Sequence, residues 1–357
     1  MGIFDKVLSS GESIFKNEVA LSYDFVPKLV PFRENQQFRI ANCIKPIFNK
    51  MNGRNAVIFG PPGIGKTVAT KHVLRELEEE TDDIIPLYIN CWQKGTSYKI
   101  YLDICDQLEY KFTHNKRTEE LLDIIKRIIN KKAAVFTFDE IDKAEDPNFI
   151  YSLLEEIHYK SIICLTNEKS WSSALDKRIM SRFNPETIEF QPYTRTETEG
   201  ILKERIQLAF HSGVVQDDAL QLVTDKTFER KDMRTGLYLL KEAGLAAEDR
   251  SSRTLEKEDV AKAIEKMQDF KIKDVDELEE EHQDILKIIK EKTPIKIGDL
   301  YKSYQENGGN ASYKTFQRRI QKLQENKFVS IKKQIGGSEG TTTIIHYDAT
   351  NRQLNEF

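Results

Sequence analysis

A glycine-rich motif, Gly-Pro-Pro-Gly-Ile-Gly-Lys-Thr at residues 60–67, constrains the fold of this 357-residue chain more than any other feature. It follows an apolar run at 56–59 and precedes a helical pattern from Val68 to Glu79. A glycine loop between a strand and a helix can turn backbone N–H groups toward phosphate oxygens, and the amino end of the helix adds partial positive charge. The motif therefore predicts a nucleotide site. The residues expected to contact the nucleotide are Pro62, Gly63, Ile64, Gly65, Lys66, Thr67 and Val68.

Apolar β-rich runs alternate with helical patterns through the first half of the chain. The runs lie at 56–59, 86–89, 134–138, 161–165 and 187–190, after an amphipathic helical pattern at 34–50. Continuous apolar strands that alternate with helices predict an α/β fold with a parallel sheet covered on both faces. From residue 196 the strands stop. Helical patterns at 197–210, 217–227, 232–248 and 257–267 then predict a small helical lid domain.

The last part of the chain has a different order of elements. Helices are expected at 281–291, 298–305 and 312–326, followed by two strands at 328–333 and 341–347 around a glycine loop at 336–340. Three helices and a hairpin predict a winged helix-turn-helix. The domains expected are a nucleotide-binding core with an N-terminal arm at 1–195, a lid at 196–273 and a winged helix at 274–357. The acid-rich segment 274–281 is expected to be a linker or the solvated start of the next helix.

Charge is unevenly distributed along the chain. The net charge is −4, but from His282 onward thirteen basic residues face eight acidic ones, a net of +5, so the preceding part carries −9. The total charge alone argues against a nucleic-acid binder. A basic tail domain on an acidic body is a more useful observation than the total. The four cysteines are scattered without a CxxC pair, which predicts reduced thiols rather than a zinc site. There is no apolar run of about 18 residues, so a cytoplasmic protein with no membrane partner is expected.

Polar residues at two strand ends complete the predicted nucleotide chemistry. Asp139 and Glu140 follow the strand at 134–138, and Asn167 follows the strand at 161–165. In phosphate-loop enzymes, an acid in this place holds Mg²⁺ together with the loop threonine, here Thr67, and a second acid activates the attacking water. Asn167 is expected to align that water beside the γ-phosphate, while Lys66 reaches the β- and γ-phosphates.

Three arginines are candidates for phosphate contacts. Arg178 and Arg182 lie four residues apart on one helical face, and either could act in a neighbouring molecule as an arginine finger, with Arg182 preferred. Arg234 stands at the start of a lid helix, where the helix dipole does not favour a cation, which supports a ligand role.

The order of these motifs resembles that of the AAA+ ATPases. In addition, Val-Pro-Phe-Arg-Glu-Asn-Gln at 30–36 is similar to the adenine-side element of the archaeal origin-recognition and cell-division-control initiator family, and the resemblance extends from about Phe25 to Tyr347. It implies that residues 60–67 are Walker A, Asp139 and Glu140 are Walker B, and Asn167 and Arg234 are the two sensors. The implied adenine-side residues are Val30, Pro31 and Arg33.

The resemblance also implies two DNA-binding segments. A segment after the second strand would contact phosphates through Lys94, Thr96, Ser97, Tyr98 and Lys99. The third helix of the winged domain would enter the major groove. Its candidate DNA contacts are Ser312, Tyr313, Lys314, Thr315, Gln317, Arg318, Arg319 and Lys322, and those of the wing are Lys332 and Lys333.

The resemblance implies a nucleoid-associated replication initiator. Such a protein binds ATP or ADP with Mg²⁺, hydrolyses ATP slowly, binds double-stranded origin DNA, recruits or loads the replicative helicase, and associates with itself or a paralogue on DNA. Two alternatives stay open. One is a branch-migration type of AAA+ motor, and the other is a signalling ATPase whose winged helix binds protein.

Overall fold

The computed structural model describes residues 13–276, 280–325, 329–334 and 342–347. The chain divides into two compact units, with the division between Ala261 and Lys262. The boundary predicted between core and lid falls inside the first unit and stays a prediction. The glycine loop expected at 336–340 lies outside the described residues.

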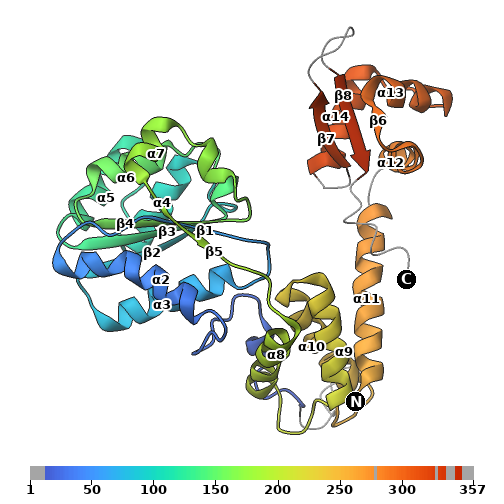
Figure 1. Cartoon of the computed structure of the whole chain (residues 1–357), viewed down its shortest axis with the longest axis horizontal. Helices are drawn as coiled ribbons and strands as arrows, with labels where there is room; N and C mark the ends of the chain where they lie inside the picture. The colour runs from blue at the N-terminus through green and yellow to red at the C-terminus, as the bar shows by residue number, and fades with distance from the viewer. Residues whose placement is uncertain (1–12, 277–279, 326–328, 335–341, 348–357) are drawn as a thin grey trace. The chain divides into compact units, whose positions relative to one another are not determined.

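A five-stranded sheet forms the centre of the nucleotide-binding part of the first unit (Figure 1). Its strands are β1 (Ala56–Phe59), β2 (Ile84–Asn90), β3 (Ala133–Asp139), β4 (Lys160–Thr166) and β5 (Glu186–Glu189). Their spatial order is β2-β3-β4-β1-β5, and every neighbouring pair is parallel. The predicted parallel α/β fold is therefore confirmed, and all strand carboxyl ends, including those that carry Asp139 and Asn167, lie at one edge.

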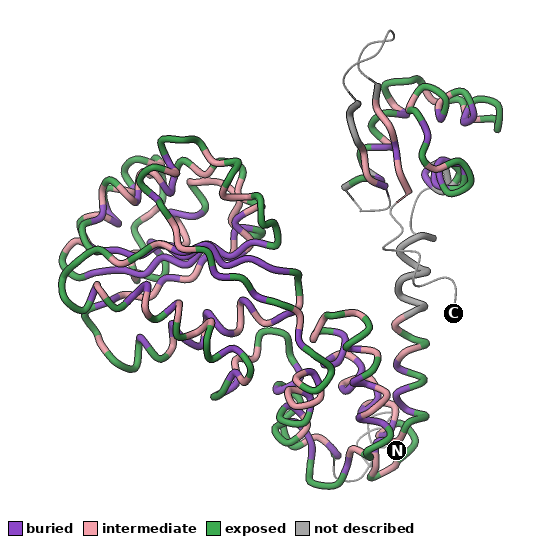
Figure 2. The backbone as a smooth tube through the Cα atoms, viewed as in Figure 1, coloured by how far each residue is buried: buried purple, intermediate pink, exposed green. Residues whose placement is uncertain are grey.

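Helices cover both faces of this sheet because alternate residues of each strand are apolar on opposite sides. In β3, Phe136 and Phe138 belong to one buried cluster, while Val135 belongs to the other. The first cluster is covered by α4 (Ser97–Gln107), α5 (Thr118–Ile129), α6 (Asn148–Glu156) and α7 (Lys177–Phe183). The second is covered by α2 (Glu34–Ile44) and α3 (Lys66–Glu80). Figure 2 shows the strands as an almost continuously buried layer between the two helical layers.

The helical part of the first unit begins after β5. Its helices are α8 (Arg195–Ala209), α9 (Asp217–Arg230), α10 (Met233–Asp249) and the start of α11 (Lys257–Asp276), which continues past the division between the units. The N-terminal arm packs against these helices. Phe15 stacks on Phe210 with ring centroids 4.8 Å apart, and the buried Arg205 donates to the carbonyl of Ala20 at 3.0 Å. The arm thus supplies part of the core of the lid.

After the end of α11, the described part of the second unit contains three helices and a small antiparallel sheet. The helices are α12 (Glu280–Lys292), α13 (Ile297–Glu306) and α14 (Tyr313–Glu325), and the strands are β6 (Ile295–Lys296), β7 (Val329–Gln334) and β8 (Thr342–Tyr347). The strand order is β6-β8-β7. Leu300, Phe316, Ile320 and Ile345 lie in its buried core. This sequence of elements is the one expected of a winged helix.

Three local expectations differ from the structure. The helix expected at 34–50 ends at Ile44 and continues as a 3₁₀ helix, Lys45–Asn49, because Pro46 cannot donate an α-helical hydrogen bond. The acid-rich segment 274–281, expected to be a linker or the start of the next helix, contains the end of α11 at Asp276, and α12 begins in it at Glu280. The two-residue strand β6 was not predicted, because two residues carry too little periodicity and its partner β8 is distant in sequence.

Truncation of the sheet core will destabilise the protein. Phe136 has no exposed surface, whereas Phe112 is 80% exposed, so the two residues form a matched pair. We expect Phe136→Ala to lower the free energy of unfolding by ~3–5 kcal/mol, since it removes buried area and leaves a cavity. Phe112→Ala should change it by less than about 0.5 kcal/mol. The midpoint of urea unfolding measures both. Equal shifts would contradict the assignment of Phe136 to the core.

Candidate functional site

The phosphate loop joins β1 to α3 and depends on glycine at three positions. Gly60, Gly63 and Gly65 have φ angles of +152°, +72° and +86°, which side chains rarely adopt. A Cβ on Gly65 would also lie 2.6 Å from the Tyr193 hydroxyl, and one on Gly60 would lie 2.4 Å from the carbonyl oxygen of Phe190. The loop is therefore packed closely on its neighbours and can form only with glycine at these places.

Lys66 is the central cation of the loop and is only 7% exposed. Its ammonium group donates to the carbonyl oxygens of Gly60 and Pro61, both at 2.7 Å, and to Oδ1 of Asn167 at 2.8 Å. Burial lowers the pKa of Lys66 to about 8, although Asp139 opposes the shift. The structure thus brings Asn167 and Lys66, which are predicted from separate motifs, into direct contact.

The carboxylate of Asp139 accepts three hydrogen bonds and is 5% exposed. Thr67 donates its hydroxyl to Oδ2 at 2.7 Å, the Tyr88 hydroxyl donates to the same oxygen at 2.6 Å, and the Glu140 N–H donates to Oδ1 at 2.8 Å. Tyr88 was missed by the sequence reasoning. In the sequence, its only signal is a polar hydroxyl within the apolar run of β2. Burial raises the pKa of Tyr88 well above the ordinary value, and Asp139 raises it further by a smaller amount.

Thr67 and Asp139 fit a magnesium ion. Both are hard oxygen groups, and they already meet at the carboxyl edge of the sheet. Among the described residues there is no cluster of three or more His, Cys, Asp or Glu side chains that could hold a metal. Mg²⁺ commonly uses one or two protein ligands together with phosphate oxygens and water.

Glu140 lies next to Asp139 in a strained backbone conformation. Its φ angle is +52°, which is uncommon for a residue with a side chain and clusters at functional sites. Burial raises the pKa of Glu140, and the neighbouring Asp139 raises it further, while Arg234 opposes both. Arg234 also helps to lower the pKa of Lys66, after the larger effect of burial. The positive charge of Arg234 therefore influences the pKa values of both Lys66 and Glu140.

A lid helix begins directly on the phosphate loop. The backbone N–H of Met233 donates to the carbonyl of Gly63 at 2.9 Å, and the Asp232 carboxylate caps α10 by accepting from the Arg234 N–H. A Cβ on Gly63 would come within 1.9 Å of Oδ1 of Asp232. The loop and α10 are thus in contact, and Arg234 is held one residue beyond that contact.

Arg33 supports the loop from the adenine side. Its guanidinium donates to the carbonyl of Ile64 at 3.0 Å and to that of Gln191 at 2.7 Å, and it lies 3.7 Å from the centroid of the Tyr193 ring. These protein contacts bury it, so a contact with adenine stays a prediction. The other residues predicted at the nucleotide vary in exposure: Val30 and Ile64 are buried, Pro31 and Val68 are half-buried, and Pro62 is exposed.

The two candidate finger arginines differ in their surroundings. Arg182 makes an ion pair with Glu155 and lies over the ring of Tyr151. The side chain of Arg178 is 82% exposed and is held only by Asp176 at 3.2 Å. Arg178 is therefore freer to reach a neighbouring molecule than Arg182, although Arg182 was preferred from the sequence.

The residues predicted to bind DNA in the first unit lie where β2 leads into α4. Lys94 makes an ion pair with Asp103 at 3.5 Å, and the Thr96 hydroxyl caps α4 by accepting from the Lys99 N–H. Ser97 is half-buried, while Tyr98 and Lys99 are exposed. The segment thus offers an exposed turn at the start of a helix.

The residues predicted on α14 separate into two groups. Lys314, Gln317 and Arg318 are exposed at helical spacing. Arg319, in contrast, donates to the Tyr304 hydroxyl at 2.8 Å. Ser312 and Thr315 form the cap of the helix, and Tyr313 packs edge-on against Tyr301. Lys322 lies on α14 and Lys332 and Lys333 on β7, with side chains outside the described part of the structure.

Known families match both parts of the first unit. A family described as an AAA domain matches residues 50–171, which include the phosphate loop, Asp139, Glu140 and Asn167. A family described as the Cdc6 AAA+ ATPase-type lid domain matches residues 199–265, which include Arg234.

Similar proteins extend over most of the chain. ORC1-type DNA replication protein 1 of Sulfurisphaera tokodaii is 35% identical over 276 residues, which are 73% of this chain and 69% of that protein. ORC1-type DNA replication protein 2 of Archaeoglobus fulgidus is 30% identical over 92% of this chain and 89% of its own length. The fold is similar to that of the Aeropyrum pernix ORC1 protein in complex with DNA, with a TM-score of 0.75 and 24% identity over 97% of this chain and 98% of that one.

The buried charge of Lys66 should cost stability when no nucleotide is present. We expect Lys66→Met to raise the unfolding midpoint at pH 7 by an amount equivalent to roughly 1 kcal/mol, since a partly compensated buried charge is removed. The folded pKa of about 8 lies below the usual 10.5, so the wild type gains stability as the pH rises from 8 toward 10.5. Thermal unfolding at pH 7 and pH 9.5 should therefore show the difference shrinking at the higher pH.

The exposed Lys131 provides the matched control for that experiment. Lys131→Met should leave the midpoint within about 0.5 kcal/mol of the wild type at both pH values. A Lys66→Met protein that is less stable than the wild type at pH 7 would show that the hydrogen bonds of the ammonium group outweigh its burial.

Proposed function

Because this chain belongs to the archaeal ORC1/Cdc6-type family of replication initiators, we propose that it is an ATP-dependent switch that recognises origin DNA and helps to recruit or load the replicative helicase. Its first unit is an AAA+ ATPase core with the lid of that family. The observation that supports the proposal is the contact of α10 with the phosphate loop. Arg234, one residue beyond that contact, opposes the rise that burial and Asp139 cause in the pKa of Glu140, the proposed hydrolytic acid. No described helix is long and apolar enough to cross a membrane.

The residues at the carboxyl edge of the sheet would have separate roles in ATP binding. Lys66 would exchange its three protein oxygen partners for β- and γ-phosphate oxygens. Thr67 and Asp139 would hold Mg²⁺, which neutralises phosphate charge when it is bound, and Tyr88 fixes the orientation of the Asp139 carboxylate. Asn167, released by Lys66, would align the attacking water.

Glu140 would accept the proton of that water. Its raised pKa makes it a stronger base than an ordinary glutamate, and its strained backbone holds it beside Asp139. Arg234 would add positive charge from the lid, and Arg178 or Arg182 of a neighbouring molecule would complete the site. Hydrolysis would be slow in a single molecule, because the last cation comes from a self-associated copy or a paralogue.

Replacement of Glu140 should separate binding from hydrolysis. We expect Glu140→Gln to keep ATP affinity within about threefold while lowering the hydrolysis rate by about 10²–10⁴, the usual contribution of a general base. Single-turnover hydrolysis and equilibrium binding of a fluorescent ATP analogue measure the two effects. Glu145→Gln, a change at an exposed glutamate five residues later, is the control and should leave both values unchanged. A Glu140→Gln protein with wild-type hydrolysis would exclude this residue as the base.

DNA would be held mainly by the second unit. The exposed Lys314, Gln317 and Arg318 form one face of α14, and arginine and glutamine can read guanine and adenine in the major groove. Lys94, Thr96, Ser97, Tyr98 and Lys99 of the first unit would add phosphate contacts, as would Lys322, Lys332 and Lys333 of the second. With DNA bound at two places, the nucleotide bound under the lid would influence DNA binding and, through DNA binding, the helicase. Such a protein would work in the cytoplasm on the nucleoid.

The two adjacent arginines of α14 give the sharpest test of DNA recognition. We expect Arg318→Ala to weaken binding to the specific site by ~1–3 kcal/mol and to relax its sequence preference. Arg319→Ala should instead lower the thermal stability of the second unit, since its guanidinium donates to Tyr304. The measurement is fluorescence anisotropy with duplexes tiled across the neighbourhood of the gene, at fixed salt, with ATP, ADP or no nucleotide.

The pattern of binding decides among the possible functions. Selective nanomolar binding to a few repeated elements supports an origin initiator. Uniform weak binding together with rapid DNA-stimulated ATP turnover would favour a branch-migration motor. An absence of DNA binding in every nucleotide state would favour a signalling ATPase and contradict the proposal.

A further inference from the structure

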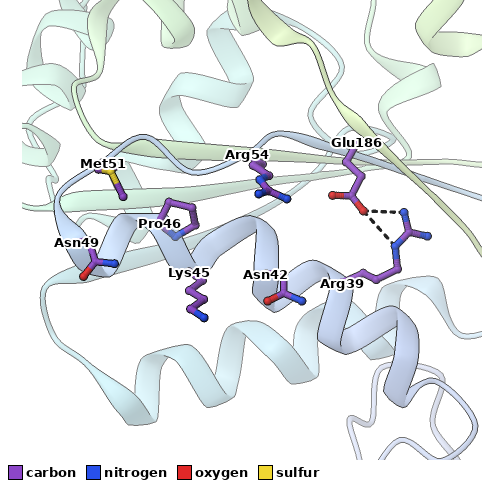
Figure 3. Close-up of a pocket in the computed structure, with 8 residues that line it drawn as sticks. All are labelled: Arg39, Asn42, Lys45, Pro46, Asn49, Met51, Arg54 and Glu186. Carbon is purple, nitrogen blue, oxygen red and sulfur yellow. Dashed lines mark hydrogen bonds and ion pairs between the residues drawn. The ribbon is translucent and has the colours of Figure 1, made fainter.

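A polar pocket of about 440 Å³ lies at the edge of the sheet that is remote from the phosphate loop (Figure 3). Its walls come from α2, the 3₁₀ helix Lys45–Asn49, the segment before β1 and the first residue of β5. The polar residues that line it are Arg39, Asn42, Lys45, Asn49, Arg54 and Glu186. The volume is within the range of small-molecule sites in proteins, about 300–1,000 Å³. No part of the predicted nucleotide or DNA chemistry uses these residues.

The single acid of the pocket is already neutralised. Arg39 donates from Nε and Nη2 to Oε1 of Glu186, at 3.1 and 2.7 Å, and its Nη2 also donates to the carbonyl of Thr187 (Figure 3). The other carboxylate oxygen of Glu186 lies 3.7 Å from the thiol of Cys43, which donates to it. These contacts fix both side chains, so that the Arg39–Glu186 pair forms a rigid, nearly neutral wall.

Two further cations in the pocket have no acidic partner. Lys45 and Arg54 make no ion pair with any residue within the described ranges, and both are exposed. The pocket therefore has a net positive charge, although residues 1–281 together carry −9. Like charges that line one pocket without a counter-ion cost free energy, so a local excess of positive charge on an acidic body favours an anionic ligand.

The donors in the pocket suit a phosphate group. Arg54 offers a planar fork of N–H donors, Lys45 offers a mobile ammonium group, and the carboxamides of Asn42 and Asn49 can donate as well. A phosphate group has several oxygens that accept bonds from different directions, and guanidinium forks fit its geometry. Of the eight residues that line the pocket, Pro46 and Met51 are apolar and the other six are polar or charged.

The pocket is separate from the nucleotide site. Arg54 lies two residues before β1, whereas the phosphate loop begins directly after it, so the strand of four residues, ~13 Å at 3.3 Å per residue, stands between them. Similarly, α2 has Arg33 at its amino end and Lys45 just past its carboxyl end. Residues that contact the phosphate loop and residues that line the pocket therefore lie at opposite ends of the same elements.

We propose that this pocket is a second anion site, which binds a small ligand with two or more phosphate groups at Lys45 and Arg54. Arg39 acts as a positioning residue, because it holds Glu186 and the wall of the pocket in place. The ligand is held by charge at an open surface, so binding will be weak and will fall as the salt concentration rises.

Titration calorimetry with inorganic pyrophosphate, without nucleotide or magnesium and at low salt, tests the proposal on the full chain. We expect two binding events. Lys66→Ala should abolish the event at the phosphate loop and leave the other. Lys45→Gln/Arg54→Gln should weaken the other event at least tenfold and leave the first. Lys111→Gln/Lys131→Gln, which removes the same charge from exposed sites elsewhere, should change neither event.

Three results would overturn the proposal. The first is a single binding event that disappears in Lys66→Ala. The second is a second event that persists unchanged in Lys45→Gln/Arg54→Gln, provided that circular dichroism and the unfolding midpoint show this variant to be folded. The third is that Lys45→Gln/Arg54→Gln weakens binding to a 20-base-pair duplex but not to pyrophosphate. That result would assign these cations to the DNA backbone instead.

Discussion

The ammonium group of Lys66 is held at the carboxyl edge of the sheet by the carbonyl oxygens of Gly60 and Pro61 and by the amide oxygen of Asn167. This contact requires β1 and β4 to be adjacent and parallel, with Phe59 paired to Thr166, because only then do the residues after each strand meet. The next strand, β3, delivers Asp139 to the same edge. The strand order and the loop conformation therefore determine the polar site together. A change in strand order would separate all the groups that are proposed to bind phosphate.

Local patterns were sufficient to predict most of the elements. The apolar runs identified all five strands of the main sheet, since buried parallel strands are apolar on both faces. The glycine motif located the phosphate loop, because positive φ angles leave few alternatives. The same reasoning failed where tertiary contacts decide the outcome. Helix α11 continues into an acid-rich segment that was expected to be a linker or the start of the next helix, and β6 exists only because β8 pairs with it.

Candidate site residues could be predicted where a sequence motif fixes their position. They could not be predicted where a partner distant in the sequence fixes it. Lys66, Thr67 and Asp139 could be named from spacing alone. The hydrogen bond from Tyr88 to Asp139 depends on the pairing of β2 with β3, which one sequence does not reveal. Arg319 likewise belongs to the buried face of its helix through Tyr304, a residue 15 positions earlier, whereas the adjacent Arg318 is exposed. Helical periodicity alone does not separate two such neighbours.

The packing of the N-terminal arm on the lid means that the polypeptide passes between lid and sheet twice, once near Arg33 and once near Gln191, and Arg33 ties the two passages together. In the sequence, the segments of the sheet thus lie between two parts of the lid. On the ribosome, Phe15 is made first, but its partner Phe210 follows almost two hundred residues later. The sheet can assemble as soon as β5 has been made, whereas the lid has to wait for its last helices. The order of synthesis therefore favours a finished nucleotide-binding core before the lid that closes on it.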